Sequence, residues 1–172
     1  MNAVLETIKQ RRSIRSYEDR QIPSEELGVI LEAARFAPSG KNQQAAKFVV
    51  VQSDAMRKKI EETCVKALGL EKSPFYGAPT FAFVFEGPTA LTPVLDGAVA
   101  IENMMLAAAS IGIGSCWIHA SSRFFASPEG KLLQKELGVP ESFECIDGCV
   151  LGYAKGERPN AAPRAENSVL LR

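Results

Sequence analysis

The sequence predicts an α+β domain in which helices and strands form separate layers. Stretches of helical period and short apolar runs follow one another along the 172 residues, without the regular spacing of βαβ units. The composition, 46% hydrophobic and 23% charged, is ordinary for a globular protein with one core. The length suits a single domain over residues 1–172 and is short for two.

The first half of the chain is predicted to be mostly helical. A short amphipathic helix covers residues 3–10. A second helix has Ser24 as its N-cap and ends before Pro38, because the residue preceding a proline is disfavoured in the helical conformation. The apolar run 47–51 predicts a buried strand, and a polar helix follows over about 54–68.

The second half is predicted to hold the remaining strands, separated by helices. The apolar run 79–85 predicts a strand, and residues 95–112 predict a long helix that is apolar on most sides and therefore central. Segments 114–120 and 144–154 are predicted strands, with a helix at 128–137 between them. The closing stretch has no core of its own, so its apolar end either packs on another surface or frays.

Charge and composition exclude several classes of partner. Twenty basic residues balance twenty acidic ones, whereas broad nucleic-acid binding needs a basic excess that displaces counterions, so no nucleic-acid partner is expected. The chain starts without the apolar segment of a signal peptide, and its longest apolar stretch, 94–118, is interrupted by polar residues. We therefore expect a cytoplasmic protein that does not enter membranes.

The four cysteines lie in apolar stretches and are expected to be buried free thiols. Cys145 and Cys149 form a weak metal motif, because the chain has one histidine and the ligand set is incomplete. No metal is expected.

A basic cluster, RRSIRSY, directly follows the first predicted helix. If this segment is extended, Arg11, Ser13 and Arg15 point the same way, because side chains alternate along an extended chain. Two guanidinium groups around a hydroxyl suit a phosphate dianion, since each can donate two parallel hydrogen bonds. The alternative is a solvated charged turn paired with Glu18 and Asp19.

The stretch PSGKNQQ lies between a predicted helix and a predicted strand. It is not a nucleotide phosphate loop, because Arg35 and Asn42 occupy the positions where that motif needs a glycine and a hydroxyl. Ser39, Asn42 and Gln44 can donate and accept hydrogen bonds, which suits the edge of a heterocycle or a ribityl chain. As an isolated loop it would be an ordinary turn.

A third candidate is GIGSCWIHA, which contains the only tryptophan and the only histidine. Its glycines lead from helix into strand, the reverse of a dinucleotide fingerprint, so a Rossmann site is rejected. Cys116 and His119 would face opposite sides of a strand, and no G-x-S-x-G elbow occurs, so hydrolase chemistry is not supported. For His119 alone, the favoured interpretation is a satisfied core or interface residue. A shortage of acid–base groups suggests a borrowed cofactor.

Taken in this order, the pieces resemble the FMN-dependent nitroreductase family in its short-chain form, over nearly the whole chain. The similar segments are RRSIRSY, APSGKNQQ, FYGAP with the following strand, DGAVAIENMMLAAASIGIGSCWI, and LGYAKGERPNAAPR. The resemblance implies a three-layer α/β/α sandwich with a mainly antiparallel sheet. It also implies an intertwined homodimer with FMN at the subunit boundary, and a tail, about 155–172, that packs on the partner subunit.

The implied activity is reduction of electron-poor acceptors, such as nitroaromatics or quinones, by NADH or NADPH through flavin N5 in a ping-pong reaction. A non-catalytic FMN-binding or regulatory protein, and a different flavin chemistry on the same scaffold, are the alternatives. The generic family pattern has Pro-Trp after the loop and Glu-Gly on the flavin-side strand. This chain has Ala45 and Ala46, and His119 and Ala120, at those places.

Residue by residue, the resemblance implies three groups of flavin contacts. One group holds the phosphate and the pyrimidine edge, the second reaches the flavin from the other subunit, and the third lines the ring and addresses N5. The members are Arg11, the backbone of Arg12, Ser13, Arg15 and Arg164 in the first group, Ser39, Asn42 and Gln44 in the second, and Trp117 and Ile118 with the backbone N–H of His119 or Ala120 in the third.

Overall fold

The computed structural model describes residues 2–166 and 169 and contains six α-helices, one short 3-10 turn and four strands in that part of the chain. The order along the chain is α1 (Ala3–Gln10), α2 (Ser24–Arg35), η1 (Gly40–Asn42), β1 (Ala46–Val51), α3 (Asp54–Leu68), β2 (Thr80–Glu86), α4 (Pro93–Ser110), β3 (Gly114–Trp117), α5 (Ala120–Phe125), α6 (Pro128–Glu136) and β4 (Glu144–Gly152).

The four strands form one sheet in the order β1-β2-β4-β3, and every neighbouring pair is antiparallel. The N-terminal segment continues the sheet beyond β3, because Ser13 forms a parallel bridge with Ser115 and Tyr17 an antiparallel bridge with Ala154. The sheet therefore brings the basic cluster beside the strand that carries Trp117.

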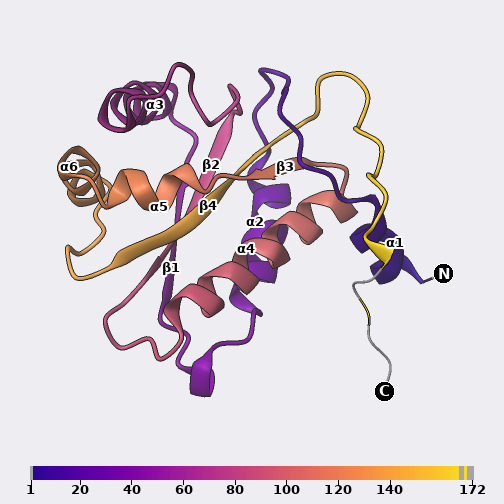
Figure 1. Ribbon diagram of the computed structural model, residues 1–172, viewed down its shortest axis with the longest axis horizontal. Coiled ribbons are helices and arrows are strands. Elements are labelled where there is room, and N and C mark those ends of the chain that lie inside the picture. The colour runs from indigo at the N-terminus through magenta and orange to yellow at the C-terminus, as the bar shows by residue number, and fades with distance from the viewer. Residues whose placement is uncertain (1, 167–168, 170–172) are drawn as a thin grey trace.

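Helices cover both faces of the sheet, as the resemblance implied (Figure 1). Alternation along β2 sends Phe81, Phe83 and Phe85 into one core cluster and Ala82 and Val84 into another. The first cluster includes side chains of α3, α5 and α6, and the second includes side chains of α2 and α4. The predicted three-layer α/β/α sandwich is confirmed.

The layer containing α3, α5 and α6 covers what we call the aromatic face. Phe75 stacks on Phe81 with ring centroids 4.5 Å apart, and Phe83 meets Phe125 edge-on at 5.0 Å. These rings are almost completely buried, and offset and edge-on pairs contribute packing energy beyond the area they bury. The chain closes this face with its own side chains.

The layer containing α2 and α4 covers what we call the α4 face. At Gly97 an added Cβ would lie 2.7 Å from Cγ2 of Ile146, so the helix lies close to the sheet only because this residue lacks a side chain. The opposite side of α4 remains uncovered, with Leu95 67% exposed and Val94 65% exposed. Large apolar side chains in such positions indicate an interaction surface.

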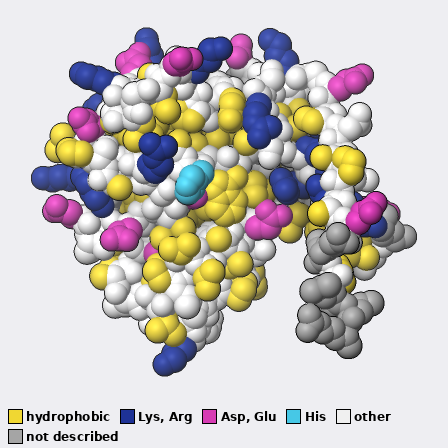
Figure 2. Space-filling view, viewed as in Figure 1, with side chains coloured by type: hydrophobic (Ala, Val, Ile, Leu, Met, Phe, Trp, Pro, Cys, Tyr) yellow, Lys and Arg dark blue, Asp and Glu magenta, His cyan; other side chains and the backbone are white. Residues whose placement is uncertain are grey.

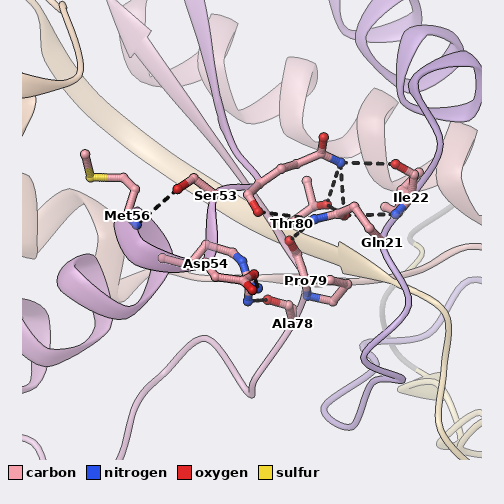
Figure 3. A network of polar contacts seen from close by, with 10 residues as sticks. Gln21, Ile22, Ser53, Asp54, Met56, Ala78, Pro79 and Thr80 are labelled. Atoms are coloured by element: carbon pink, nitrogen blue, oxygen red, sulfur yellow. Dashed lines mark hydrogen bonds and ion pairs between the residues drawn. The ribbon is translucent and has the colours of Figure 1, made fainter.

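A polar network fixes the segment between the basic cluster and α2 to the start of β2 (Figure 3). Gln21 donates from Nε2 to the carbonyl of Pro79 at 2.8 Å and accepts from the Thr80 hydroxyl at 2.6 Å. Gln52 donates to the same Gln21 oxygen at 3.0 Å. The network anchors the N-terminal segment and leaves the buried Thr80 hydroxyl satisfied.

Two predicted details of secondary structure are wrong. The N-cap of α2 is Pro23, and Ser24 is the first helical residue, with no side-chain capping bond. The predicted strand 114–120 ends at Trp117, and Ala120 begins the unpredicted helix α5. A helix of six residues has too little length to show a period, and its formation depends on packing of its buried phenylalanines instead.

The cysteines are free thiols in the described residues. A β-bulge where β4 pairs with Val84 and Phe85 places Cys145 against the aromatic-face cluster, while Cys149 belongs to the α4-face cluster. Burial raises the pKa of the Cys149 thiol to about 12. The two thiols face opposite sides of the sheet, so this pair does not form a shared metal site.

Within residues 2–166 and 169, no helix combines the length and the apolar character needed to cross a bilayer. Residues 167–168 and 170–172, the end of the predicted partner-packing tail, lie outside the described residues.

Candidate functional site

The basic cluster forms a small hollow at the end of α4. Arg11, Arg12 and Arg158 line it together with Ser115. Arg11 pairs with Glu102 of α4, with 3.4 Å between Nε and Oε1, and Arg12 donates from Nη1 to the Lys9 carbonyl at 2.7 Å. Three guanidinium groups with one paired carboxylate leave net positive charge here.

Two buried polar atoms at this hollow have no partner among the described residues. They are Nε of Arg12 and the hydroxyl oxygen of Ser115. A buried donor without a partner costs about 1–3 kcal/mol, so these atoms are candidates for hydrogen bonds to a bound ligand. Ser13, bridged to Ser115, lies beside the same place.

The structure separates two of the predicted phosphate ligands from the hollow. The Arg15 guanidinium lies 5.9 Å from the Tyr76 ring centroid, and a hydrogen bond to Tyr76 raises the pKa of Arg15. Arg164 is exposed in the tail and donates to the carbonyl of Ala162 at 3.5 Å. Arg158, from the same tail, lines the hollow and donates to the Gly112 carbonyl at 3.2 Å.

The second predicted group, Ser39, Asn42 and Gln44, does come together in one loop. The backbone N–H of Gln44 donates to the Ser39 hydroxyl at 3.0 Å, and the Gln44 amide donates to Oδ1 of Asn42 at 2.9 Å. Gly40 N–H donates to both carboxylate oxygens of Asp96, each at 3.1 Å. The first turn of α4 therefore holds this loop in place.

The loop backbone is strained. Lys41, Asn42 and Gln44 all have positive φ, at 51°, 56° and 50°. Non-glycine residues in this region cost of the order of 1 kcal/mol or more each, and such strain persists only where the surroundings enforce it. The strain sets the directions in which the Asn42 and Gln44 amides point, which fits a binding loop better than an ordinary turn.

A cavity of about 740 Å³ lies between this loop and the α4 face. Its lining is partly apolar, from Phe36 and Phe48, and includes the carboxyl groups of Glu86 and Asp96. Glu86 is 2% exposed, and in the described part of the chain neither of its oxygens has a hydrogen-bond partner. Burial, and then the nearby charge of Asp96, raise the pKa of Glu86 to about 7.

The loop containing η1 and the segment that follows α1 lie near opposite ends of α4 in one chain (Figure 1). The loop is attached at Asp96 in the first turn, and the hollow is lined by Ala109 in the last. Thirteen residues separate them, which at 1.5 Å per residue is about 20 Å. A single chain therefore does not bring these two predicted groups into one site.

The third predicted group clusters around a buried carboxylate, Asp147 of β4. Trp117 donates from Nε1 to Oδ2 of Asp147 at 2.8 Å, and Nδ1 of His119 lies 2.9 Å from the same oxygen. Ser122 N–H reaches Oδ1 at 3.3 Å. Asp147 is 5% exposed whereas the His119 side chain is 80% exposed, so of the two predicted places for His119, core or interface, the core is excluded.

Ile118 does not share a surface with Trp117. Its side chain is 3% exposed and lies in the aromatic-face cluster, and its N–H donates to the Gly148 carbonyl at 2.8 Å. His119 is the N-cap of α5 and Ala120 its first residue, so both follow the end of β3 beside the half-buried Trp117.

Sequence reasoning missed three residues of these sites. Asp147 and Glu86 are acidic residues within or at the end of apolar strands, and a charge in a buried run was the available signal. Arg158 gave no signal that distinguishes it from the other tail arginine, because extended tails have no periodicity.

The nitroreductase family profile matches residues 8–153, which is most of the chain. The chain belongs to the nitroreductase family.

Individual members of the nitroreductase family match along most of their length. A nitroreductase with bound FMN from Bacteroides fragilis is 34% identical and superposes with a TM-score of 0.94, covering 99% of each chain. A protein of Archaeoglobus fulgidus with the provisional name NADH dehydrogenase/NAD(P)H nitroreductase is 36% identical over 92% of this chain and 89% of its own. An FMN reductase (NAD(P)H) of Bacillus subtilis is 30% identical over 95% of this chain and 70% of its own.

Proposed function

We propose that the protein is an FMN-dependent NAD(P)H oxidoreductase that reduces electron-poor acceptors such as nitroaromatics or quinones. The observation that carries the proposal is the match to an FMN-bound nitroreductase over 99% of both chains. Membership in the family makes the chain a flavin oxidoreductase, and curated relatives are named for NAD(P)H and for FMN.

The residues present fit the phosphate of FMN. Arg11, Arg12 and Arg158 surround a hollow in which Arg12 Nε and the Ser115 hydroxyl lack partners among the residues described, and a phosphate dianion accepts from such donors. Ser13 adds a hydroxyl at the bridge to Ser115. We assign these residues to the phosphate, and Arg158 rather than Arg164 to the contribution of the tail.

The ring system of FMN fits the remaining groups only if two chains cooperate. The polar loop of one chain lies about 20 Å from its own hollow along α4, so it serves the flavin held by the partner. Exposed apolar side chains on α1 and α4 support burial of these helices against a second chain. They are Val4, Leu5 and Ile8 of α1 and Val94, Leu95 and Val99 of α4. The exposed tail, 155–166, extends this interface in the proposal.

When bound, FMN would supply the redox chemistry, which is hydride transfer from NADH or NADPH and two-electron reduction of the acceptor. The chain supplies position and electrostatics. Trp117 offers an aromatic surface, and its orientation is fixed by the bond to Asp147. The Asn42 and Gln44 amides offer donors and acceptors to the edge of the ring, and Arg15 offers positive charge that stabilises the reduced flavin. The backbone N–H of His119 or Ala120 is assigned to N5.

Anaerobic spectroscopy of the purified protein tests this function. The protein should be yellow, or become yellow with added FMN, and NADH or NADPH should bleach the flavin absorption. Subsequent addition of a quinone should restore the colour. A yellow protein that neither nicotinamide bleaches would contradict the reductase proposal and favour a flavin-binding protein without this activity. Failure to bind FMN would reject the whole assignment.

A further inference from the structure

The single histidine of the chain occupies an unusual position beside the proposed flavin ring. Its ring nitrogen Nδ1 is held by a buried carboxylate while most of the imidazole is exposed. Figure 2 shows the histidine, in cyan, at the surface next to a group of hydrophobic side chains. The arrangement combines a fixed imidazole with free access for a small molecule.

The hydrogen bonds of Asp147 determine which nitrogen of His119 carries the proton. An ionised carboxylate only accepts hydrogen bonds, and Oδ2 already receives the Trp117 indole N–H, which only donates. Nδ1 of His119 at 2.9 Å therefore also donates to this oxygen. In the neutral ring this leaves Nε2 as the free basic nitrogen, directed away from Asp147.

The position of His119 is fixed from two directions. Its backbone begins α5 immediately after β3, and its ring is held to β4 through Asp147. The same carboxylate orients Trp117, the residue proposed to form the wall of the ring site. An imidazole oriented in this way by a carboxylate is a recurrent arrangement for transferring protons at Nε2.

We propose that His119, oriented by Asp147, is the proton donor to the acceptor in the oxidative half-reaction. This inference rests on the proposed function. Reduction of a quinone to its hydroquinone takes up two electrons and two protons, of which a hydride supplies both electrons and one proton. The second proton moves from Nε2 of the imidazolium to the quinone oxygen, the Nε2–H bond breaks and an O–H bond forms. The neutral imidazole then recovers a proton from water.

A purely structural role for the cluster makes different predictions. Asp147 also binds Trp117 and the backbone of Ser122, and those bonds alone would join β3, β4 and α5. In that case the state of Nε2 would be irrelevant to the reaction. The tests below therefore separate His119 from the rest of the cluster.

The first test needs no activity. Because the chain has one histidine, imidazole nitrogen NMR of the flavin-free protein gives one pair of signals. We expect the neutral ring to be protonated at Nδ1 and free at Nε2, and Asp147→Asn to abolish this preference. The indole N–H signal of the only tryptophan reports whether the variant remains folded. A neutral ring protonated at Nε2 in the unchanged protein would overturn the proposal.

The second test compares two acceptors with the pre-reduced, flavin-loaded protein. A quinone needs protons, whereas ferricyanide takes electrons only. His119→Gln should slow quinone reduction about 100-fold, the size of a general acid contribution, and change ferricyanide reduction less than about twofold. Thr63→Ala on α3 is the control, because it also removes a hydroxyl that bonds a backbone carbonyl, that of Lys59, and lies outside the Asp147 cluster; it should leave both rates unchanged.

Each result leads to a distinct conclusion. Equal losses with the two acceptors, or no loss with either, would overturn the role of His119 while leaving the reductase proposal intact. An unchanged protein that reduces neither acceptor after treatment with NADH and NADPH would overturn the proposed function, and the donor role with it.

Discussion

The two faces of the sheet differ in how completely the chain covers them. On the aromatic face, phenylalanines from β2, α5 and the segment before β2 interlock with almost no exposure. On the α4 face, small residues bring α4 close to the sheet, yet its outer side leaves Val94 and Leu95 about two-thirds exposed.

This difference indicates that the aromatic face mainly stabilises the fold, whereas the α4 face carries the candidate functional elements. The loop and the basic cluster both attach to α4, through Asp96 and Glu102. Gln44, with its strained backbone, lines the cavity on this side, as does Glu86, whose carboxyl has no hydrogen-bond partner among the described residues. The aromatic face supports the sheet, and the α4 face carries the surfaces proposed to bind the cofactor and a second chain. Four predictions test this division.

The largest effect is expected on the aromatic face. Phe83→Ala removes a 1% exposed ring that contacts Phe75, Phe81 and Phe125, and should lower the free energy of unfolding by about 3–5 kcal/mol in urea denaturation. Leu132→Ala on α6 is the control, because Leu132 is 71% exposed and the change should cost less than about 0.5 kcal/mol. Similar losses of unfolding free energy in Phe83→Ala and Leu132→Ala would contradict the distinction between the closed aromatic face and exposed surfaces.

A second test uses the buried acid of the α4 face. The pKa of Glu86 is raised from 4.5 to about 7 by burial and by Asp96, so the folded state holds this proton where the unfolded chain has lost it. The stability from the neutral carboxyl is present below pH 4.5 and is lost as the pH rises to about 7. The full loss is about 3 kcal/mol at 1.36 kcal/mol per pH unit.

Glu86→Gln keeps a neutral side chain at every pH and should remove this loss. Unfolding free energies of both proteins at pH 5 and pH 8 provide the measurement. At pH 8 we expect the variant to have a higher free energy of unfolding than the unchanged protein. At pH 5 we expect the two values to differ little. A parallel pH dependence in the two proteins would show that Glu86 ionises without cost.

A third test concerns cofactor affinity. Arg11→Ala and Arg158→Ala should each weaken FMN binding by about 1.5–3 kcal/mol, the size of a hydrogen bond to a charged group. Arg164→Ala is the matched comparison in the same tail. Titration of the apoprotein, followed by quenching of flavin fluorescence, measures all three. If Arg164→Ala weakened FMN binding and Arg158→Ala did not, Arg164 and not Arg158 would be the tail residue that contacts the phosphate.

The smallest effect on folding, with a clear effect on assembly, is expected on the outer side of α4. Leu95 is already exposed, so Leu95→Asp should change the free energy of unfolding of one chain by less than about 0.5 kcal/mol. The same change should shift sedimentation from dimer to monomer, because it places a charge in the proposed interface. Leu132→Asp, equally exposed on α6, should leave the dimer intact. A dimer that survives Leu95→Asp would exclude this side of α4 from the interface.

Local patterns were sufficient for much of the fold. The boundaries of α1 and α3 match the prediction, because a helical period and a clear cap or stop residue mark each of them. The apolar run 79–85 predicted a strand, and β2 covers Thr80–Glu86. The short α5 was missed, since six residues cannot reveal a helical period.

Long-range contacts of the candidate sites could not be predicted in the same way. His119 and Asp147 meet because β3 and β4 pair at the edge of the sheet, and no local pattern sets that strand order. The place of Arg158 beside Arg11 depends on the course of a tail without secondary structure. The family resemblance supplied the candidate residues, and the structure shows which of them come together.

Because the loop and the basic cluster both attach to α4, the length of this helix fixes the distance between the two proposed binding elements. Gly40 is fixed at Asp96 and Arg11 at Glu102. One residue inserted between these anchors would rotate one relative to the other by about 100° and move them about 1.5 Å further apart. The contacts around each anchor would stay unchanged. The number of residues in α4 thus sets the spacing between its two attachment points.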